Sequence, residues 1–276
     1  KLSGVIKMAE YKIIDIHAHI FPEKIASKAV RAIGDYYGVP MEGEGTVEDL
    51  LKKGSAIGVS KYVVHSSATD VHQVAAINDY ILQVQKSSDL FIGFGTLHPD
   101  LSDPLKEVER IISLGLHGIK LHPEFQHFVI DSEEMMPVYE AIEGRLPLLI
   151  HMGDENTDSS SPKRLARVLD KFPGMVVIAA HFGGYRAWDE AFRYLVGRDI
   201  FMDTSSSLRF LEPSEALNII RKHGVSKILF GSDYPMWTHK DEFERFLKLD
   251  LNENERALIL HGNAEKLLSL RHGVKT

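Results

Sequence analysis

Eight short apolar segments recur along the chain, and this repetition constrains the fold more than any other feature. Each segment is rich in β-branched residues and ends in a turn containing Gly, Pro, Ser or Asp, which is typical of a buried strand. Their first residues lie 24 to 49 residues apart, and a strand with its crossover helix takes about 30 residues. The sequence therefore predicts eight parallel strands, at Lys12–Ile20, Lys61–Thr69, Phe91–Pro99, Gly118–Phe125, Pro147–Asp154, Val176–Gly184, Ile200–Ser207 and Lys227–Pro235.

Eight strand–helix units predict an α/β fold, a (β/α)8 TIM barrel in a single domain. The chain has 276 residues, and such a barrel needs roughly 250. An open doubly wound sheet is the rival fold, but the phosphate-binding motifs GxGxxG and GxxxxGK[ST] are absent. We assign residues 1–276 to one domain, with residues 1–10 as an N-terminal extension. The glycine-rich stretch Phe21–Thr46 is expected to be either a lid over the barrel mouth or a plain surface insertion.

Composition limits both the partners and the metal chemistry. The chain contains no cysteine, so disulfides and thiolate metal sites are excluded and a metal must bind nitrogen and oxygen ligands. A formal net charge of −7 argues against a nucleic-acid partner. No apolar run approaches the roughly 18 residues that a membrane span requires. We therefore expect a cytoplasmic protein that acts on a small molecule, and the sequence leaves open whether it forms a homo-oligomer.

The first strand ends in a pair of histidines within the motif IIDIHAH. Because side chains alternate along a strand, we expect Asp15, His17 and His19 on the inner face, with Ile14 and Ile16 packing outward on the helices. Residues i and i+2 are about 6.6 Å apart along a strand, and two imidazoles at that spacing can bind one ion. Asp15 is then expected to accept a hydrogen bond from a ligating imidazole.

Three later strands also end in a histidine or an aspartate: His151, His181 and Asp233. Such groups are costly in an apolar lining unless they are paired or bound to a metal, and barrel active sites lie at the carboxyl ends of the strands. Together with the first histidine pair, they predict a site for one or two divalent metal ions. Zinc suits these ligands best, with manganese and iron as alternatives.

This motif set resembles the amidohydrolase superfamily, which carries HxH after the first strand, His after the fifth and sixth, and Asp after the eighth. The phrases DIHAHIFP, GIKLHPEFQ, AAHFGG and LFGSDYPMW are similar to its amidohydrolase 2 branch, which contains predicted TIM-barrel metal-dependent hydrolases and non-oxidative decarboxylases. The resemblance covers nearly the whole chain and implies a distorted barrel whose metal ligands are His17, His19, His151 and Asp233. It also implies that His181 is a second-metal ligand or a catalytic acid/base, and that Asp233 moves the proton of a water molecule.

Lys120, on the fourth strand, distinguishes the subtypes. The resemblance implies that in binuclear members a lysine at this place is carbamylated by carbon dioxide and bridges two metals, whereas decarboxylases of the branch generally lack it. As a plain ammonium, Lys120 would instead be a catalytic or substrate-binding group, or it would pair with an acid at the rim. All three interpretations remain open at this point.

Other residues are weaker candidates. Four lie at or just after strand ends and are predicted to line the substrate pocket: His98, His122, Trp188 and Trp237. For the two tryptophans, packing between helix and loop is the commoner alternative. His65 lies within the second strand, where a satisfied core histidine is an equally good interpretation. We expect solvated side chains for the histidines in predicted helices or tails, which are His72, His223, His239, His261 and His272.

The leading hypothesis is a metal-dependent hydrolase of a small amide, ester or lactone, in which a metal-activated water attacks the substrate. The alternative is a mononuclear decarboxylase of an aromatic or unsaturated carboxylic acid. A non-catalytic barrel that binds a small molecule is the third hypothesis, because the fold alone does not determine function.

Overall fold

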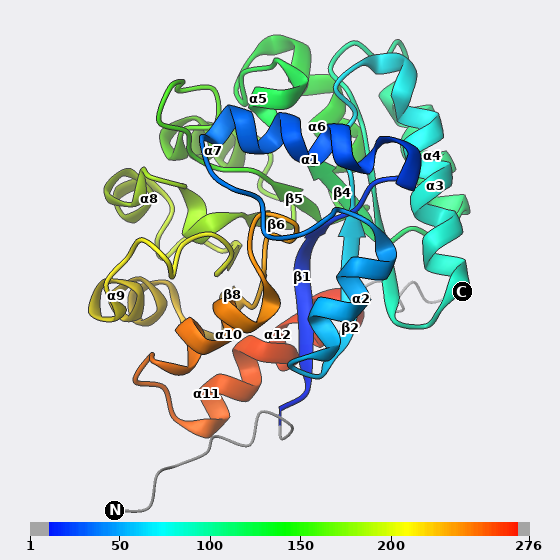
Figure 1. Ribbon diagram of the computed structural model, residues 1–276. Coiled ribbons are helices and arrows are strands. Elements are labelled where there is room, and N and C mark those ends of the chain that lie inside the picture. Colours follow the sequence, from blue (N-terminus) through cyan, green and yellow to red (C-terminus); the bar gives the residue numbers. More distant parts are fainter. Residues whose placement is uncertain (1–10, 270–276) are drawn as a thin grey trace, which may run out of the picture.

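The computed structural model describes residues 11–269, which form a parallel eight-stranded barrel (Figure 1). The strands follow one another around the sheet in chain order, and each pairs in parallel with the next. They are β1 Ile13–His19, β2 Val59–His65, β3 Phe91–Thr96, β4 Gly118–Leu121, β5 Leu148–Ile150, β6 Val177–Ala179, β7 Phe201–Asp203 and β8 Ile228–Leu229. The predicted TIM barrel is confirmed, with a strand inside each of the eight predicted segments except β2, which begins two residues early. The expected extension, residues 1–10, lies outside the described residues.

The barrel closes between its first and last strands. The Ile16 N–H donates to the Phe230 carbonyl at 3.0 Å, and the Asp233 N–H donates to the His17 carbonyl at 2.9 Å. A parallel bridge also joins Ala18 to Tyr234. These bonds fix the end of β8 against the histidine pair of β1, so closure of the barrel itself brings together three of the predicted ligands, His17, His19 and Asp233.

Helices surround the barrel, and one of them crosses its mouth. The α-helices are α1 Glu23–Tyr37, α2 Val47–Ser55, α3 Val74–Ser87, α4 Pro104–Ser113, α5 Pro123–Gln126, α6 Met136–Ile142, α7 Pro162–Lys171, α8 Trp188–Tyr194, α9 Pro213–His223, α10 His239–Leu247, α11 Glu253–Ala257 and α12 Asn263–Ser269. The Asp103 side chain caps α4 by accepting from the Lys106 N–H at 3.0 Å, as the Asp-Pro sequence predicts. Helix α1, formed by the glycine-rich insertion, lies across the strand ends near β4 and β5 (Figure 1).

The interior of the barrel corrects one prediction about β1. Ile14 and Ile16 pack in a buried cluster with residues of β2, β3 and β5–β8 and with α12 (Ile14, Ile16, Val63, Phe94, Leu149, Ile178, Ala180, Phe201, Leu229, Ala264, Leu267 and Leu268). The two isoleucines therefore point inward, not outward as strict alternation predicts. Asp15 instead faces away from this cluster and lies 3.0 Å from His239 on α10. The pairing of β1 with β2 is irregular between Asp15 and Ala18, and this bulge turns the following histidine to the inside.

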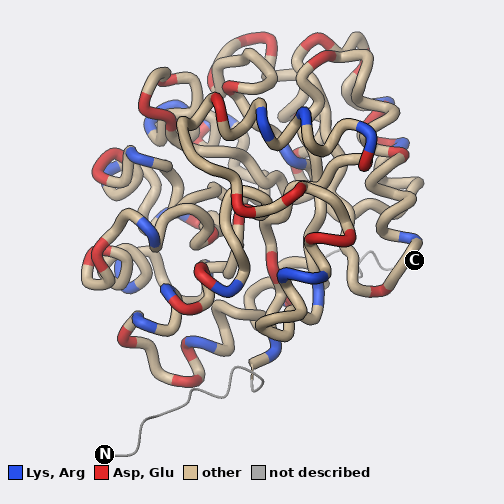
Figure 2. The backbone as a smooth tube through the Cα atoms, in the orientation of Figure 1, with Lys and Arg blue, Asp and Glu red and all other residues tan. Residues whose placement is uncertain are grey.

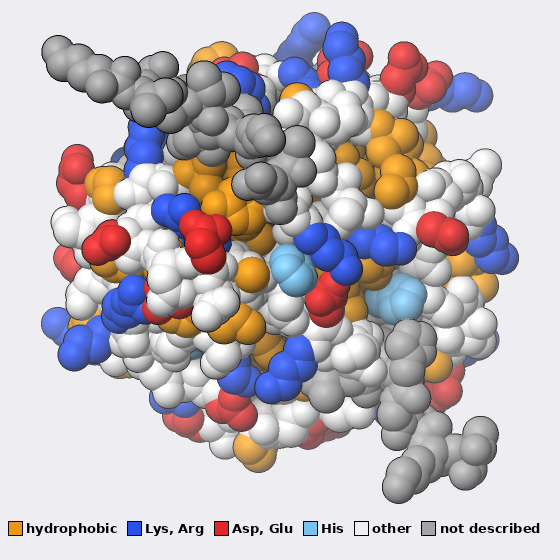
Figure 3. All heavy atoms as spheres, turned by 90° about the horizontal axis from the view of Figure 1, so that it is seen from below, with side chains coloured by type: hydrophobic (Ala, Val, Ile, Leu, Met, Phe, Trp, Pro, Cys, Tyr) orange, Lys and Arg blue, Asp and Glu red, His pale blue; other side chains and the backbone are white. Residues whose placement is uncertain are grey.

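The outer surface carries charge of both signs. Acidic and basic positions are both scattered over the outer helices in Figure 2. The face at the amino ends of the strands shows charged and apolar side chains interspersed (Figure 3). Among residues 11–269, no helix is both long and apolar enough to cross a bilayer.

Candidate metal centre and active site

The end of β1 supplies two converging imidazoles. The Nε2 atoms of His17 and His19 are 3.1 Å apart. Asp233, from the loop after β8, places its Oδ1 atom 3.4 Å from His17 Nε2 and 3.5 Å from His19 Nε2. Three of the four ligand positions that the resemblance implies therefore meet around one point.

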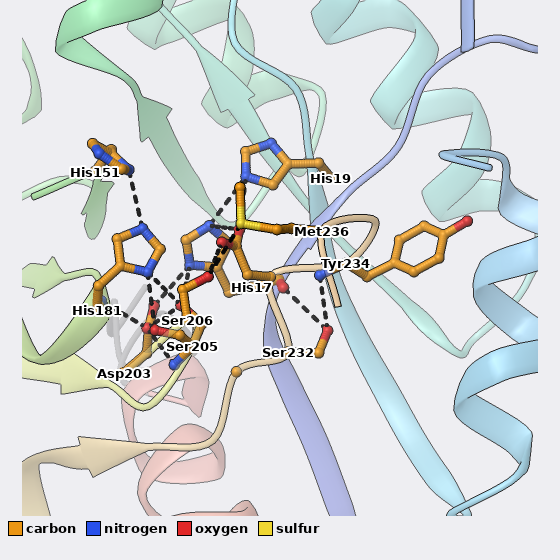
Figure 4. Close-up of polar contacts among 12 residues, drawn as sticks. His17, His19, His151, His181, Asp203, Ser205, Ser206, Ser232, Tyr234 and Met236 are labelled. Carbon is orange, nitrogen blue, oxygen red and sulfur yellow. Dashed lines mark hydrogen bonds and ion pairs between the residues drawn. The ribbon is translucent and has the colours of Figure 1, made fainter. Parts of the chain in front are cut away.

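Asp203, at the end of β7, fixes the ring of His17. The His17 Nδ1–H donates to Asp203 Oδ2 at 2.9 Å, which leaves the Nε2 lone pair directed at His19 and Asp233. The other carboxylate oxygen, Oδ1, accepts from the backbone N–H groups of His181 and Ser205, each at 3.0 Å. Asp203 therefore positions both His17 and the start of the His181 loop (Figure 4).

A second pair of imidazoles lies beside the first. His181 Nε2 is 3.0 Å from His151 Nδ1, and the His181 ring stacks on His17 with 5.2 Å between centroids. Backbone carbonyls assign the tautomers: His181 Nδ1–H donates to Ser205 O at 3.0 Å, and His151 Nε2–H donates to Gly153 O at 2.8 Å. The facing nitrogens of His151 and His181 are consequently both lone-pair donors.

This donor set fits a divalent cation. Ligating histidines commonly donate their second ring N–H to a carboxylate or a carbonyl, and His17, His151 and His181 all do so here. The facing lone pairs of His151 and His181, whose nitrogens are 3.0 Å apart, repel unless a proton or a cation lies between or beside them. Nitrogen and carboxylate donors suit zinc, manganese or iron. The residues that would hold one or two ions are His17, His19, His151, His181 and Asp233.

Burial favours the neutral form of these imidazoles. Desolvation lowers the pKa of His17, His19 and His151 below the usual histidine range. Burial alone would raise the pKa of Asp233, but the neighbouring His17 and His19 outweigh it and hold that pKa low. Neutral imidazoles beside an ionised carboxylate are the protonation states that metal binding requires.

Lys120 lies among the candidate metal ligands and is not part of the pocket lining. Its side chain is fully buried, and its Nζ atom is 3.2 Å from His17 Nε2. Burial lowers its pKa to about 8, against the opposing charges of Asp233 and Asp203. The rim ion pair considered for Lys120 is therefore not what the structure contains.

A pocket opens directly above the metal centre. Its empty space is about 390 Å³ when the open solvent at its mouth is included. Its lining combines candidate ligands with residues of the loops and of the α1 insertion: His19, Ile33, Tyr37, Met41, His122, Phe125, His151, His181, Tyr185, Ser206, Asp233, Pro235 and Met236. The insertion therefore lies over the mouth, the first of the two expected placements.

Tyr37 is a pocket residue that the sequence did not indicate. Its hydroxyl is 3.2 Å from His122 Nε2 and 3.4 Å from His151 Nε2. The neighbouring Tyr36 donates to Asp154, at the end of the β5 loop, at 3.0 Å. These contacts hold the end of α1 down on the strand ends.

Of the weaker sequence candidates, one lines the pocket and three do not. His122 lines the pocket, whereas His98, Trp188 and Trp237 are not part of its lining. The tryptophans support the wall from behind: the Trp188 indole N–H donates to His181 O at 3.0 Å, and that of Trp237 donates to Ser206 Oγ at 2.8 Å. His98 is buried beside Asp100, whose N–H it accepts at 3.2 Å.

Three expectations about buried groups are wrong. Asp15 does not contact a ligating imidazole ring; it accepts from Ser232 N–H at 2.9 Å and from Ser232 Oγ at 2.6 Å, and Asp203 has the predicted role. His239 is fully buried beside Asp15, and His223 is buried with its Nε2 bonded to Ile200 O at 2.9 Å, so neither is solvated. His272 lies outside the described residues.

Three residues of the site have left-handed backbone conformations. The φ angles of His181, Ser206 and Asp233 are 60°, 52° and 58°. Such conformations are uncommon for residues other than glycine and concentrate at functional sites. They turn the chain sharply at the strand ends, and this turn aims the His181 and Asp233 side chains into the pocket.

An amidohydrolase family model matches residues 14–270 of the chain. The chain belongs to the amidohydrolase family. This family is metal-dependent, and its members are enzymes, which include hydrolases and decarboxylases. The predicted family is thereby confirmed, and the buried histidine and aspartate groups of this amidohydrolase are of the kind that holds its metal.

Solved structures with the same fold include both kinds of enzyme. An uncharacterised TIM-barrel protein from Bordetella bronchiseptica is 20% identical with a TM-score of 0.77, covering 95% of this chain and 99% of its own. A dihydroxybenzoic acid decarboxylase from Polaromonas, with bound manganese and 2-nitroresorcinol, is 16% identical with a TM-score of 0.71, covering 94% and 97%. A probable 2-pyrone-4,6-dicarboxylic acid hydrolase from Acinetobacter baumannii is 19% identical with a TM-score of 0.68, covering 94% and 99%. At these identities the likeness supports the fold alone, and the reaction has to be inferred from the residues of the site.

Proposed function

We propose that this amidohydrolase is a metal-dependent hydrolase of a small amide, ester or lactone. The observation that carries the proposal is the position of Asp233. Its Oδ1 atom faces the Nε2 atoms of His17 and His19 at 3.4 and 3.5 Å, and the residue also lines the pocket. A carboxylate at the boundary between the metal centre and the substrate is placed to take a proton from an attacking water.

The proposed reaction divides the work among the chain's own residues. A divalent cation held by the histidines would supply Lewis acidity and lower the pKa of a water molecule from 15.7 to about 7. Asp233 accepts a proton as the water oxygen forms a bond to the carbonyl carbon. His181, also in the pocket lining, helps to return that proton to the leaving amine or alcohol as the old carbon–nitrogen or carbon–oxygen bond breaks. Ser206 Oγ donates to Asp233 Oδ2, which fixes the carboxylate for this transfer.

The position of Lys120 favours a role in binding the cation over a contact with the substrate. Its Nζ lies against His17 and is absent from the pocket lining. A carbamate formed there would supply oxygen ligands to the cation beside His17, which is the bridging interpretation. We therefore infer a catalytic role for Lys120 through the metal centre. Zinc remains the proposed ion, with manganese and iron as alternatives.

Decarboxylation of an aromatic acid is the second candidate, because the pocket has aromatic walls. Tyr37 makes edge contacts with Phe125 and with Tyr185, at 5.9 and 5.7 Å between ring centroids. Flat aromatic surfaces of this kind suit a planar ring substrate.

One experiment separates the two reactions. The metal-loaded protein is incubated in H₂¹⁸O with panels of esters, lactones, amides and hydroxybenzoic acids, and the products are examined by mass spectrometry. A hydrolase incorporates ¹⁸O into a product acid, whereas a decarboxylase releases carbon dioxide without adding water to the other product. Asp233→Asn should abolish turnover, and Asp189→Asn on the exposed surface of α8 is the matched control. Carbon dioxide release with no ¹⁸O incorporation would overturn the hydrolase proposal in favour of the second candidate.

A further inference from the structure

His65 is a fully buried polar group that the proposed reaction leaves unused. It is the last residue of β2 and pairs in register with His19 on β1. Its exposed fraction is 0%, and within residues 11–269 neither ring nitrogen has a hydrogen-bond partner. Buried polar nitrogens are nearly always satisfied, so an imidazole in this state needs an explanation.

The neighbours of His65 suggest an explanation for its unpaired nitrogens. Its ring centroid is 4.5 Å from that of His19 and 5.1 Å from that of His17. One ligand nitrogen from each of the three histidines lies within 4.8 Å of the others. Nitrogen ligands stand about 2.0–2.1 Å from a zinc ion. Two nitrogens that bind the same ion are therefore less than 4.8 Å apart. To bind the same ion, the His65 ring would have to turn toward His17 and His19.

The lack of hydrogen bonds makes this rotation easy. His17 is held by Asp203 and His181 by Ser205, but within residues 11–269 the His65 ring makes no hydrogen bond that has to break before it turns.

We propose that His65 is a further imidazole ligand of the cation that His17 and His19 hold. This inference rests on the proposed metal-dependent function and extends its ligand set to a third strand. With His65 bound, β1 and β2 would together supply three imidazoles to the cation, in addition to the ligands from the later strands. His65 lies outside the pocket lining, so its contribution is to metal binding and not to substrate contact.

Metal binding itself tests the proposal. Metal-free full-length protein is titrated with zinc against a chromophoric chelator, and separately with cobalt(II), whose visible absorption reports the number of ligands. The variants are His65→Leu and His65→Gln. His223→Gln is the control, because His223 is also buried but bonds to Ile200 O and accepts from Gly197 N at the far end of α9. Circular dichroism shows whether each variant is folded, and His65→Gln keeps a polar group should the leucine variant not fold.

Loss of a group that only supports a ligand costs about 10–100-fold in metal affinity. For a direct ligand we expect at least about 100-fold weaker zinc binding in both His65 variants and an altered cobalt spectrum, with the control unchanged. Wild-type affinity and an unchanged cobalt spectrum in a folded His65 variant would overturn this inference and leave the proposed function standing. Failure of the wild-type protein to bind zinc, cobalt or manganese would overturn both.

Discussion

Replacing Asp203 by Asn should impair metal binding although Asp203 is not itself among the proposed ligands. The Oδ1 atom of Asp203 receives three donors, from His181 N–H, Ser205 N–H and Ser205 Oγ. An asparagine must therefore place its carbonyl oxygen there and turn its NH₂ group toward His17 Nδ1. Nδ1 then has to accept, and the ring proton moves to Nε2, the atom that faces His19 at 3.1 Å. The substitution keeps the shape of the side chain but blocks the lone pair of one ligand.

The expected loss is near the upper end of the effect of outer-shell partners, about 100-fold in metal affinity, or about 2.7 kcal/mol. The assay is competition for zinc and manganese with a chromophoric chelator, at constant pH and ionic strength. Asp199→Asn is the matched control, because Asp199 precedes the same strand but is exposed and pairs with Lys227 at 2.6 Å. If Asp203→Asn binds zinc as tightly as wild type, the assignment of the His17 tautomer is wrong.

The remaining predictions concern stability. When the metal concentration is about 100 times its Kd, chelating the metal should lower the free energy of unfolding by about 2.7 kcal/mol. The Tm should fall by about 5 °C, as measured by differential scanning fluorimetry. An unchanged Tm would contradict a cation bound only by the folded state. Burial raises the pKa of Glu242 to about 8 despite its contact with Arg245. The free energy of unfolding should therefore fall as the pH rises from about 4.5 to 8, by up to about 1.4 kcal/mol per pH unit. Urea unfolding of Glu242→Gln at several pH values should lack this part of the decrease in the free energy of unfolding with pH. The same pH dependence as in the wild type would refute the prediction. Gly118→Ala should lower the free energy of unfolding by about 1–3 kcal/mol, because its Cβ would lie 2.5 Å from the Phe94 ring. Gly262→Ala, whose Cβ would make only ordinary contacts, should not lower it by that much.

The fold was predictable because its signals are local and repeated. Each strand is a short apolar run with a polar residue at its carboxyl end, and a parallel barrel places all these ends on one face. His17, His19, His151, His181 and Asp233 were therefore found from the sequence, and the structure brings them to the same end of the barrel. The roles of these residues depend on the reaction and remain proposals.

The inner and outer faces of β1 were not predictable in the same way. Strict alternation predicts Ile14 and Ile16 on the outside, yet both are in the barrel interior. A bulge between Asp15 and Ala18 changes the alternation, and such a bulge depends on the pairing of two strands distant in sequence. His17 reaches the inner side because of this irregularity.

Two functional neighbours were missed for different reasons. Asp203 ends the seventh strand as Asp233 follows the eighth, so the same signal was present and could have been used. Tyr37 lies in an insertion without periodic pattern, and only the packing of α1 over the strand ends brings its hydroxyl to His122. Contacts made by loops across the mouth depend on tertiary structure and leave little trace in the sequence.

We propose that the strand ends of this member of the amidohydrolase family hold a divalent metal ion. Elemental analysis of protein purified without chelators, and again after addition of zinc or manganese, tests it most directly. We expect one or two equivalents of metal per chain, reduced in His19→Ala and unchanged in His223→Gln. No bound metal in the wild-type protein, even after the addition of zinc and manganese, would contradict it.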